Sequence, residues 1–131
     1  MAIGPVCCSP RWWRVLFAAA LISATWASLM PMPGPQLFEM QDKVLHVVAY
    51  AAFYVLAWLS FPGPVLQWRL HGGLFAYGVA IELLQGLTPS RSMEAMDLLA
   101  DVTGLGLGCL LLSLSPVPAR LVSTALETDS R

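Results

Sequence analysis

The sequence predicts an all-α integral membrane bundle of about four transmembrane helices. Two features of its composition indicate this fold class: 57% of the 131 residues are hydrophobic, and only 11% are charged. Both values lie outside the balance of soluble globular domains. The few charges are also grouped between apolar runs, as in the loops of a multi-span protein. We expect a cytoplasmic tail over residues 1–11, one four-helix domain over 12–118 and a polar tail over 119–131.

Four apolar runs are long enough to cross a bilayer, since about 20 helical residues span about 30 Å of hydrocarbon. They cover residues 12–30, 44–61, 70–87 and 98–115, and each run stops at or close to a proline. The first run also has the basic residues and the apolar stretch of a signal peptide. However, the small residues that follow it match a signal-peptide cleavage site poorly. We therefore favour a retained first helix over a cleaved one.

The basic residues indicate which helix ends face the cytoplasm, because Lys and Arg gather on that side of membrane proteins. With four spans, five arginines fall on one side, namely Arg11, Arg14, Arg69, Arg120 and Arg131, and Lys43 and Arg91 fall on the other. We therefore expect a multi-pass protein with both termini in the cytoplasm.

Two classes of function are excluded by charge and by cysteine spacing. A net charge of -1 leaves no basic surface for nucleic acid. Cys7, Cys8 and Cys109 have neither the number nor the spacing of a disulfide framework or a zinc site. Membrane lipid is the partner that the composition predicts.

Polar residues inside the apolar runs share one level of the predicted bundle. Ionisable groups there cost about 2.5–3.5 kcal/mol each on insertion scales, so they need an explanation. Three sets at helical spacing lie at the start of the second run, the end of the third and the start of the fourth: Asp42, His46 and Tyr50; Gly78, Glu82 and Gln85; and Asp97, Asp101, Gly104 and Gly108. We expect them to form a pocket at the extracytoplasmic surface, with the last two glycines bringing a neighbouring backbone close.

The predicted pocket is acidic. Its four carboxylates outnumber the cationic side chains near it, with Asp42, Glu82, Asp97 and Asp101 set against Lys43 and Arg91. Because burial and like charge favour a neutral carboxylic acid, we expect Glu82 to be protonated or paired with His46 or Arg91. A bound cation would balance the charge equally well, since His, Asp and Glu are ligands for zinc or manganese.

Three motifs occur in order between residues 42 and 108. The first is Asp42-Lys43-x-x-His46 followed by Tyr50, and the second is the segment YGVAIELLQ over residues 77–85, followed by Pro89 and Arg91. The third is D-x-x-A-D over residues 97–101, followed by Gly104 and Gly108. Together they resemble the VanZ-like family of bacterial envelope proteins, although that family usually has Asn where this chain has Asp101. The resemblance implies a multi-pass protein of the bacterial plasma membrane; the family's founding member is associated with low-level resistance to the glycopeptide teicoplanin.

The resemblance favours an envelope protein whose pocket binds a cell-wall precursor, a lipid head group or a glycopeptide-related ligand. Arg91 would attract an anionic group such as a phosphate, while neighbouring side chains fix its orientation by hydrogen bonds. The residues expected to contact the ligand are Asp42, Lys43, His46, Tyr50, Glu82, Gln85, Arg91, Asp97 and Asp101.

Two alternatives stay open. In an integral-membrane enzyme, His46 or Glu82 would act as general base, or these two with Asp97 and Asp101 would hold a metal ion for hydrolysis or transfer on a lipid-linked substrate. No H-E-x-x-H or G-x-S-x-G motif supports this, so no metal ligand or cofactor is assigned from the sequence. In a structural scaffold, the polar residues would instead fix helix register through hydrogen bonds. Self-association of so thin a bundle also stays open.

Overall fold

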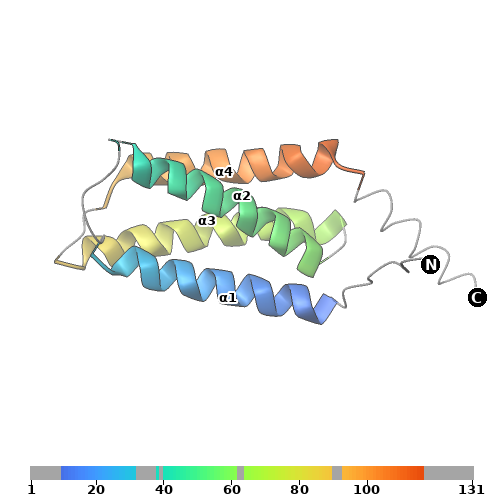
Figure 1. The fold of residues 1–131 in the computed structure, drawn as a ribbon, viewed down its shortest axis with the longest axis horizontal. Helices are drawn as coiled ribbons and strands as arrows, with labels where there is room; N and C mark the ends of the chain where they lie inside the picture. Colours follow the sequence, from blue (N-terminus) through green and yellow to red (C-terminus); the bar gives the residue numbers. More distant parts are fainter. Residues whose placement is uncertain (1–9, 32–37, 39, 62–63, 90–92, 117–131) are drawn as a thin grey trace, which may run out of the picture.

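The computed structural model describes residues 10–31, 38, 40–61, 64–89 and 93–116. Within these ranges the chain forms four α-helices: α1 (Pro10–Leu29), α2 (Gln41–Ser60), α3 (Pro64–Gly86) and α4 (Ala95–Leu114). The helices lie side by side and alternate in direction, so that α1 and α3 end where α2 and α4 begin (Figure 1). The prediction of an all-helical chain with four helices is confirmed. The predicted tails lie almost entirely outside the described residues.

Each helix begins before the apolar run that predicted it. The second begins at Gln41 rather than at residue 44, and the third at Pro64 rather than at residue 70. In α2 and α4 the first turn carries polar residues such as Asp42 and Asp97, which an apolar run does not include. Carboxylates suit this position because the amide groups of a helix N-terminus carry partial positive charge.

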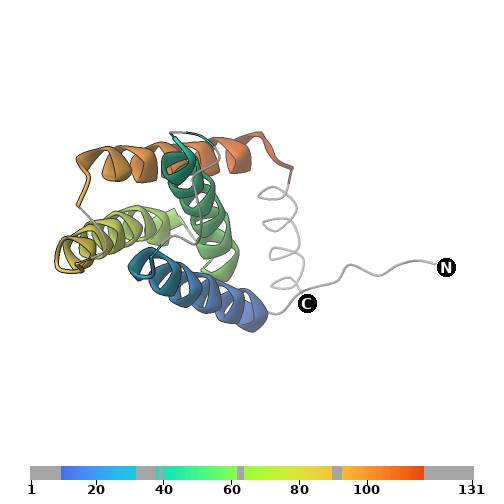
Figure 2. The same ribbon diagram turned by 60° about the vertical axis from the view of Figure 1, so that its left-hand side comes forward.

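Helix α2 lies between α4 and α1 (Figure 2). Its buried aromatic residues Tyr50, Phe53 and Tyr54 form the core together with Leu74 of α3 and Leu105 of α4. One face of α1 packs against this core. The bundle therefore encloses a single apolar core built around the middle of α2.

Two glycines allow α4 to lie directly against the backbone of α2. A Cβ atom at Gly104 would come within 2.5 Å of the Val47 carbonyl oxygen, and one at Gly108 within 2.8 Å of the Ala51 carbonyl oxygen. A larger residue at either position would have to push the helices apart. The predicted close contact through the G-x-x-x-G step is confirmed.

Two carboxylates are buried while large apolar side chains are exposed, which is unusual for a soluble protein. Glu82 and Asp101 are each 1% exposed, whereas Trp68 is 83% and Leu114 is 76% exposed. Four membrane spans were expected; among the described residues, three helices are long and apolar enough to cross a membrane: α1 from Arg11 onward, α2 and α4. Helix α3 does not join them, because it carries more polar side chains, among them Arg69, His71, Glu82 and Gln85.

Candidate functional site

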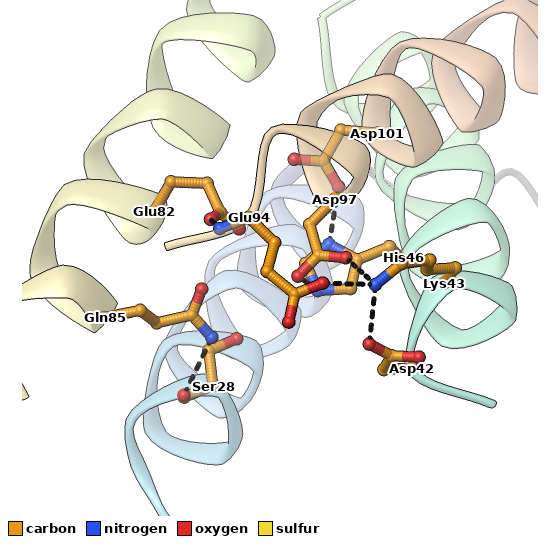
Figure 3. Close-up of polar contacts among 9 residues, drawn as sticks. All are labelled: Ser28, Asp42, Lys43, His46, Glu82, Gln85, Glu94, Asp97 and Asp101. Atoms are coloured by element: carbon orange, nitrogen blue, oxygen red, sulfur yellow. Dashed lines mark hydrogen bonds and ion pairs between the residues drawn. The ribbon is translucent and has the colours of Figure 1, made fainter. Parts of the chain in front are cut away.

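Polar side chains gather at the end of the bundle where α2 and α4 begin and α3 ends (Figure 1, left). Figure 3 shows all of them except Tyr50, and they point toward one another from the three helices and from Glu94, just before α4. We call this group the polar site; it comprises Asp42, Lys43, His46, Tyr50, Glu82, Gln85, Glu94, Asp97 and Asp101. Five of these side chains belong to residues at most 6% exposed: Tyr50, Glu82, Gln85, Asp97 and Asp101.

Lys43 links the first turns of α2 and α4. Its Nζ lies 2.8 Å from Oδ2 of Asp42, 2.8 Å from Oε2 of Glu94 and 2.8 Å from Oδ1 of Asp97. The residues at the N-caps of both helices, Met40 and Glu94, make no side-chain capping bond. The carboxylates of Asp42 and Asp97, in the first turns of these helices, both bind the lysine.

His46 is held in one orientation by Asp101. Its Nδ1 lies 2.7 Å from Oδ1 of Asp101, and its ring lies parallel to that of Tyr50, with centroids 6.5 Å apart. Since a carboxylate accepts hydrogen bonds, Nδ1 carries the proton and the Nε2 of a neutral ring keeps its lone pair. That Nε2 faces Oδ2 of Asp97 at 3.9 Å.

Gly78 provides the space that Asp101 and Tyr50 occupy. A Cβ atom at Gly78 would lie 2.6 Å from Oδ2 of Asp101 and 2.8 Å from the Tyr50 hydroxyl oxygen. Real Cβ atoms do not approach other atoms this closely, so a side chain here would displace one of the two. Gly78 of α3 therefore leaves the room that two side chains of the polar site require.

Glu82 is buried with one of its two oxygens unpaired. Oε2 accepts a hydrogen bond of 2.9 Å from the backbone N–H of Glu94, whereas Oε1 has no partner. Ligand atoms of Glu82, His46 and Asp97 lie within 4.8 Å of one another. The expected convergence is therefore present, but His46 forms its hydrogen bond with Asp101 rather than with Glu82.

Among the residues that the structure describes, three buried oxygens of the polar site have no hydrogen-bond donor. They are Oδ1 of Asp42, Oε1 of Glu82 and Oε1 of Gln85. The Gln85 amide is oriented by its Nε2, which donates to the Ser28 carbonyl oxygen at 3.1 Å, so its oxygen is an acceptor. Most buried polar atoms in proteins have a partner. Three unpaired acceptors together favour a ligand that brings hydrogen-bond donors or positive charge.

Eight of the nine residues expected to contact a ligand come together in the polar site; the ninth, Arg91, lies outside the described residues. Sequence reasoning missed Glu94 and Ser28. Glu94 precedes α4, and its i, i+3 spacing from Asp97 was the signal available. Ser28 contributes only its backbone carbonyl, which no side-chain pattern indicates.

The chain matches no protein-family model, no curated protein and no solved structure. The chemistry of the polar site is therefore interpreted from its own residues and distances.

Proposed function

We propose that the chain is a VanZ-like multi-pass protein of the bacterial plasma membrane whose polar site binds the head group of an envelope lipid or of a lipid-linked cell-wall precursor. The observation that carries this proposal is the set of three buried, unpaired acceptor oxygens on Asp42, Glu82 and Gln85. The three motifs that resemble the VanZ-like family contribute all but one residue of the site.

The exposed apolar side chains on the outside of the bundle support membrane insertion. Large apolar side chains such as Trp12, Trp26 and Leu114 are more than two-thirds exposed, while the carboxylates of Glu82, Asp97 and Asp101 are buried. Hydrocarbon favours this arrangement, and water opposes it. Helix α1 packs on the core through Phe17 and Leu21, which supports its retention as a fourth segment of the bundle.

The basic residues support an extracytoplasmic site. Arg11 and Arg14 near the start of α1, and Arg69 near the start of α3, lie at the end opposite the polar site. The positive-inside tendency assigns that end to the cytoplasm. The polar site then faces the compartment in which cell-wall precursors and the outer leaflet of the membrane are found.

The unpaired atoms define the ligand chemistry. Carboxylate and amide oxygens accept hydrogen bonds, so the matching groups are hydroxyls or ammonium groups, which sugars and amino-containing head groups carry. Arg91 is proposed to add recognition of a phosphate. Glycopeptide resistance follows from the resemblance alone and is a separate proposal.

Lipids that co-purify with the protein test the ligand. The full chain is extracted from bacterial membranes in mild detergent, and bound lipids are identified by mass spectrometry for the wild type, Glu82→Gln and His71→Ala, which changes a residue at the opposite end of the bundle. We expect wild type and His71→Ala to retain one donor-rich lipid class, and Glu82→Gln to lose at least nine-tenths of it, which is about 1.4 kcal/mol of binding free energy. The same lipid profile in all three folded proteins would overturn the proposal.

Labelling of single cysteines tests the orientation. In a chain with Cys7, Cys8 and Cys109 changed to Ser, a cysteine is placed at Met93 beside the site or at Trp68 at the opposite end; both side chains are exposed. A membrane-impermeant maleimide should label Met93→Cys in intact cells and Trp68→Cys only after permeabilisation. The reverse pattern would place the polar site in the cytoplasm.

A second candidate function is acid/base catalysis by His46. The hydrogen bond of 2.7 Å to Asp101 orients the ring and would stabilise its protonated form, as in a general base held by a carboxylate. The purified chain would then change the mass of its retained lipid during incubation, and His46→Gln would stop the change while retaining the lipid. A retained lipid whose mass stays constant favours binding alone.

A further inference from the structure

Two groups of potential metal ligands share Asp97. The outer group consists of Asp42, Glu94 and Asp97, and the inner group of His46, Glu82 and Asp97; in each, the ligand atoms lie within 4.8 Å of one another. The outer group surrounds Lys43, whose Nζ is 2.8 Å from an oxygen of each carboxylate. The protein therefore supplies a cation to the outer group. Among the described residues, no lysine or arginine forms an ion pair with Glu82 in the inner group.

The orientation of His46 suits a metal ligand. A metal-bound histidine usually donates its other N–H to a carboxylate or a carbonyl, as Nδ1 does here to Asp101. Nε2 is left facing Oδ2 of Asp97 at 3.9 Å, which is too long for a hydrogen bond. Two atoms that each lie about 2.0–2.2 Å from one ion are at most about 4.4 Å apart, so one ion can bridge this distance.

Glu82 gives an independent indication of a ligand. The residue is 1% exposed, its Oε2 is fixed by the backbone N–H of Glu94, and its Oε1 has no partner. A buried carboxylate oxygen without a donor is unfavourable unless a cation or donor compensates it. Glu82 thus presents one anchored carboxylate to the two ligands from α2 and α4.

We propose that His46 Nε2, Glu82 Oε1 and Asp97 Oδ2 bind one divalent transition-metal ion of the zinc or manganese type. One imidazole nitrogen and two carboxylate oxygens favour such ions over calcium or magnesium, which prefer oxygen ligands alone. Three protein ligands leave a coordination position open for a further group. Asp101 acts as a positioning residue that holds His46. Metal binding goes beyond the proposed lipid recognition and does not depend on it.

The charge of the polar site agrees with a divalent cation. Its carboxylates are Asp42, Glu82, Glu94, Asp97 and Asp101, whereas Lys43 is the one basic residue among the described side chains that pairs with them, besides the titratable His46. A divalent ion would reduce the excess negative charge at the point where it is most deeply buried. It would also bridge α2, α3 and α4 at a place where few direct hydrogen bonds connect α3 to the other two.

Metal analysis of the purified full chain tests the proposal. Protein in detergent is stripped with EDTA, titrated with Zn²⁺ or Mn²⁺, desalted and analysed by mass spectrometry of the elements. We expect one ion per chain in the wild type, and at least tenfold weaker binding in His46→Ala and Glu82→Gln. Asp101→Asn should weaken binding by about 10–100-fold, as for other groups that orient a metal-bound histidine.

One variant provides a matched control. His71→Ala changes the histidine at the other end of the bundle, which packs on Tyr54. It should bind metal as the wild type does. Cobalt loading adds a readout independent of stoichiometry, since imidazole and carboxylate ligands give Co²⁺ visible absorption bands that His46→Ala should alter. Size-exclusion chromatography and circular dichroism confirm that each variant is folded.

The outcomes separate this site from the proposed lipid binding. Failure of the folded wild type to bind a stoichiometric ion, or equal loss in His46→Ala and His71→Ala, would overturn the metal site. Lipid retention by a folded wild type that binds no stoichiometric ion would overturn the metal site and leave the proposed function standing. Stoichiometric metal without retained lipid would support the metal site and overturn the proposed function.

Discussion

The two ends of the bundle hold their helices together by different means. At the polar site, carboxylates from α2, α3 and α4, those of α3 and α4 buried, surround Lys43 and His46. At the opposite end, His71 packs on the rings of Tyr54 and Trp68, with centroids 4.6 Å and 6.2 Å away. There Arg14 donates from Nε to the Ser60 carbonyl oxygen at 3.2 Å, and its guanidinium lies over the Phe61 ring.

The difference indicates that buried carboxylates are not needed to assemble these helices. Ring contacts and single hydrogen bonds hold one end, and the glycine contacts of α4 with α2 hold the middle. Replacing buried ion pairs by apolar residues is often neutral or stabilising. This comparison supports our proposal that the acidic end binds a ligand.

The glycine contact should give the largest change in stability. Gly108→Leu forces a side chain against the Ala51 carbonyl oxygen and Tyr54, and we expect a loss of about 3 kcal/mol in the free energy of unfolding from overpacking. Gly106→Leu is the matched control, because a Cβ there would meet no atom within 4 Å. Thermal unfolding in detergent measures both. Equal losses would show that the α2–α4 contact does not carry the stability of the middle of the bundle.

Removal of Lys43 should rank second. Lys43→Met leaves the carboxylates of Asp42, Glu94 and Asp97 without their cation. Since the cluster is partly open to solvent, we expect a loss of about 2 kcal/mol, between the values for surface and buried pairs. The corresponding change at the other end, Arg14→Met, removes one hydrogen bond and should cost no more than about 1.5 kcal/mol. If Arg14→Met lowered the free energy of unfolding more than Lys43→Met does, the opposite end of the bundle would contribute more to stability than the lysine cluster, contrary to this prediction.

A hydrogen bond between α1 and α3 should have the smallest effect. The Tyr77 hydroxyl donates to the Leu21 carbonyl oxygen at 3.0 Å and lies 2.9 Å from the Thr25 hydroxyl. Tyr77→Phe should lower the free energy of unfolding by about 1 kcal/mol. The control is Thr103→Val, whose hydroxyl bonds within its own helix to Leu99. If Tyr77→Phe and Thr103→Val lowered the free energy of unfolding equally, the hydrogen bond between α3 and α1 would make no specific contribution to the packing of α1.

The helices and the level of the polar site could be predicted because both depend on local pattern. Hydropathy marks apolar runs, and i, i+4 spacing assigns side chains to one face of a helix. These rules placed Glu82, Asp101 and Gly104 correctly on the inward faces of α3 and α4.

Pairing within the site could not be predicted in the same way. Whether His46 meets Glu82 or Asp101 depends on the rotation and approach of neighbouring helices, which spacing along one helix does not determine. The structure pairs His46 with Asp101 and leaves Glu82 to the Glu94 backbone. Helix starts were also missed, since polar first turns carry no apolar signal.

The most direct measurement is a joint assay of stability and ligand content in Glu82→Gln. Glutamine keeps an acceptor for the Glu94 N–H and adds a donor for the neighbouring carboxylates, while one buried negative charge is removed. If the buried charge serves a ligand, the metal-free variant melts at the same or a higher temperature than the metal-free wild type and has lost its bound ion and lipid. A melting temperature several degrees lower, with ion and lipid content unchanged, would show that Glu82 serves the fold instead.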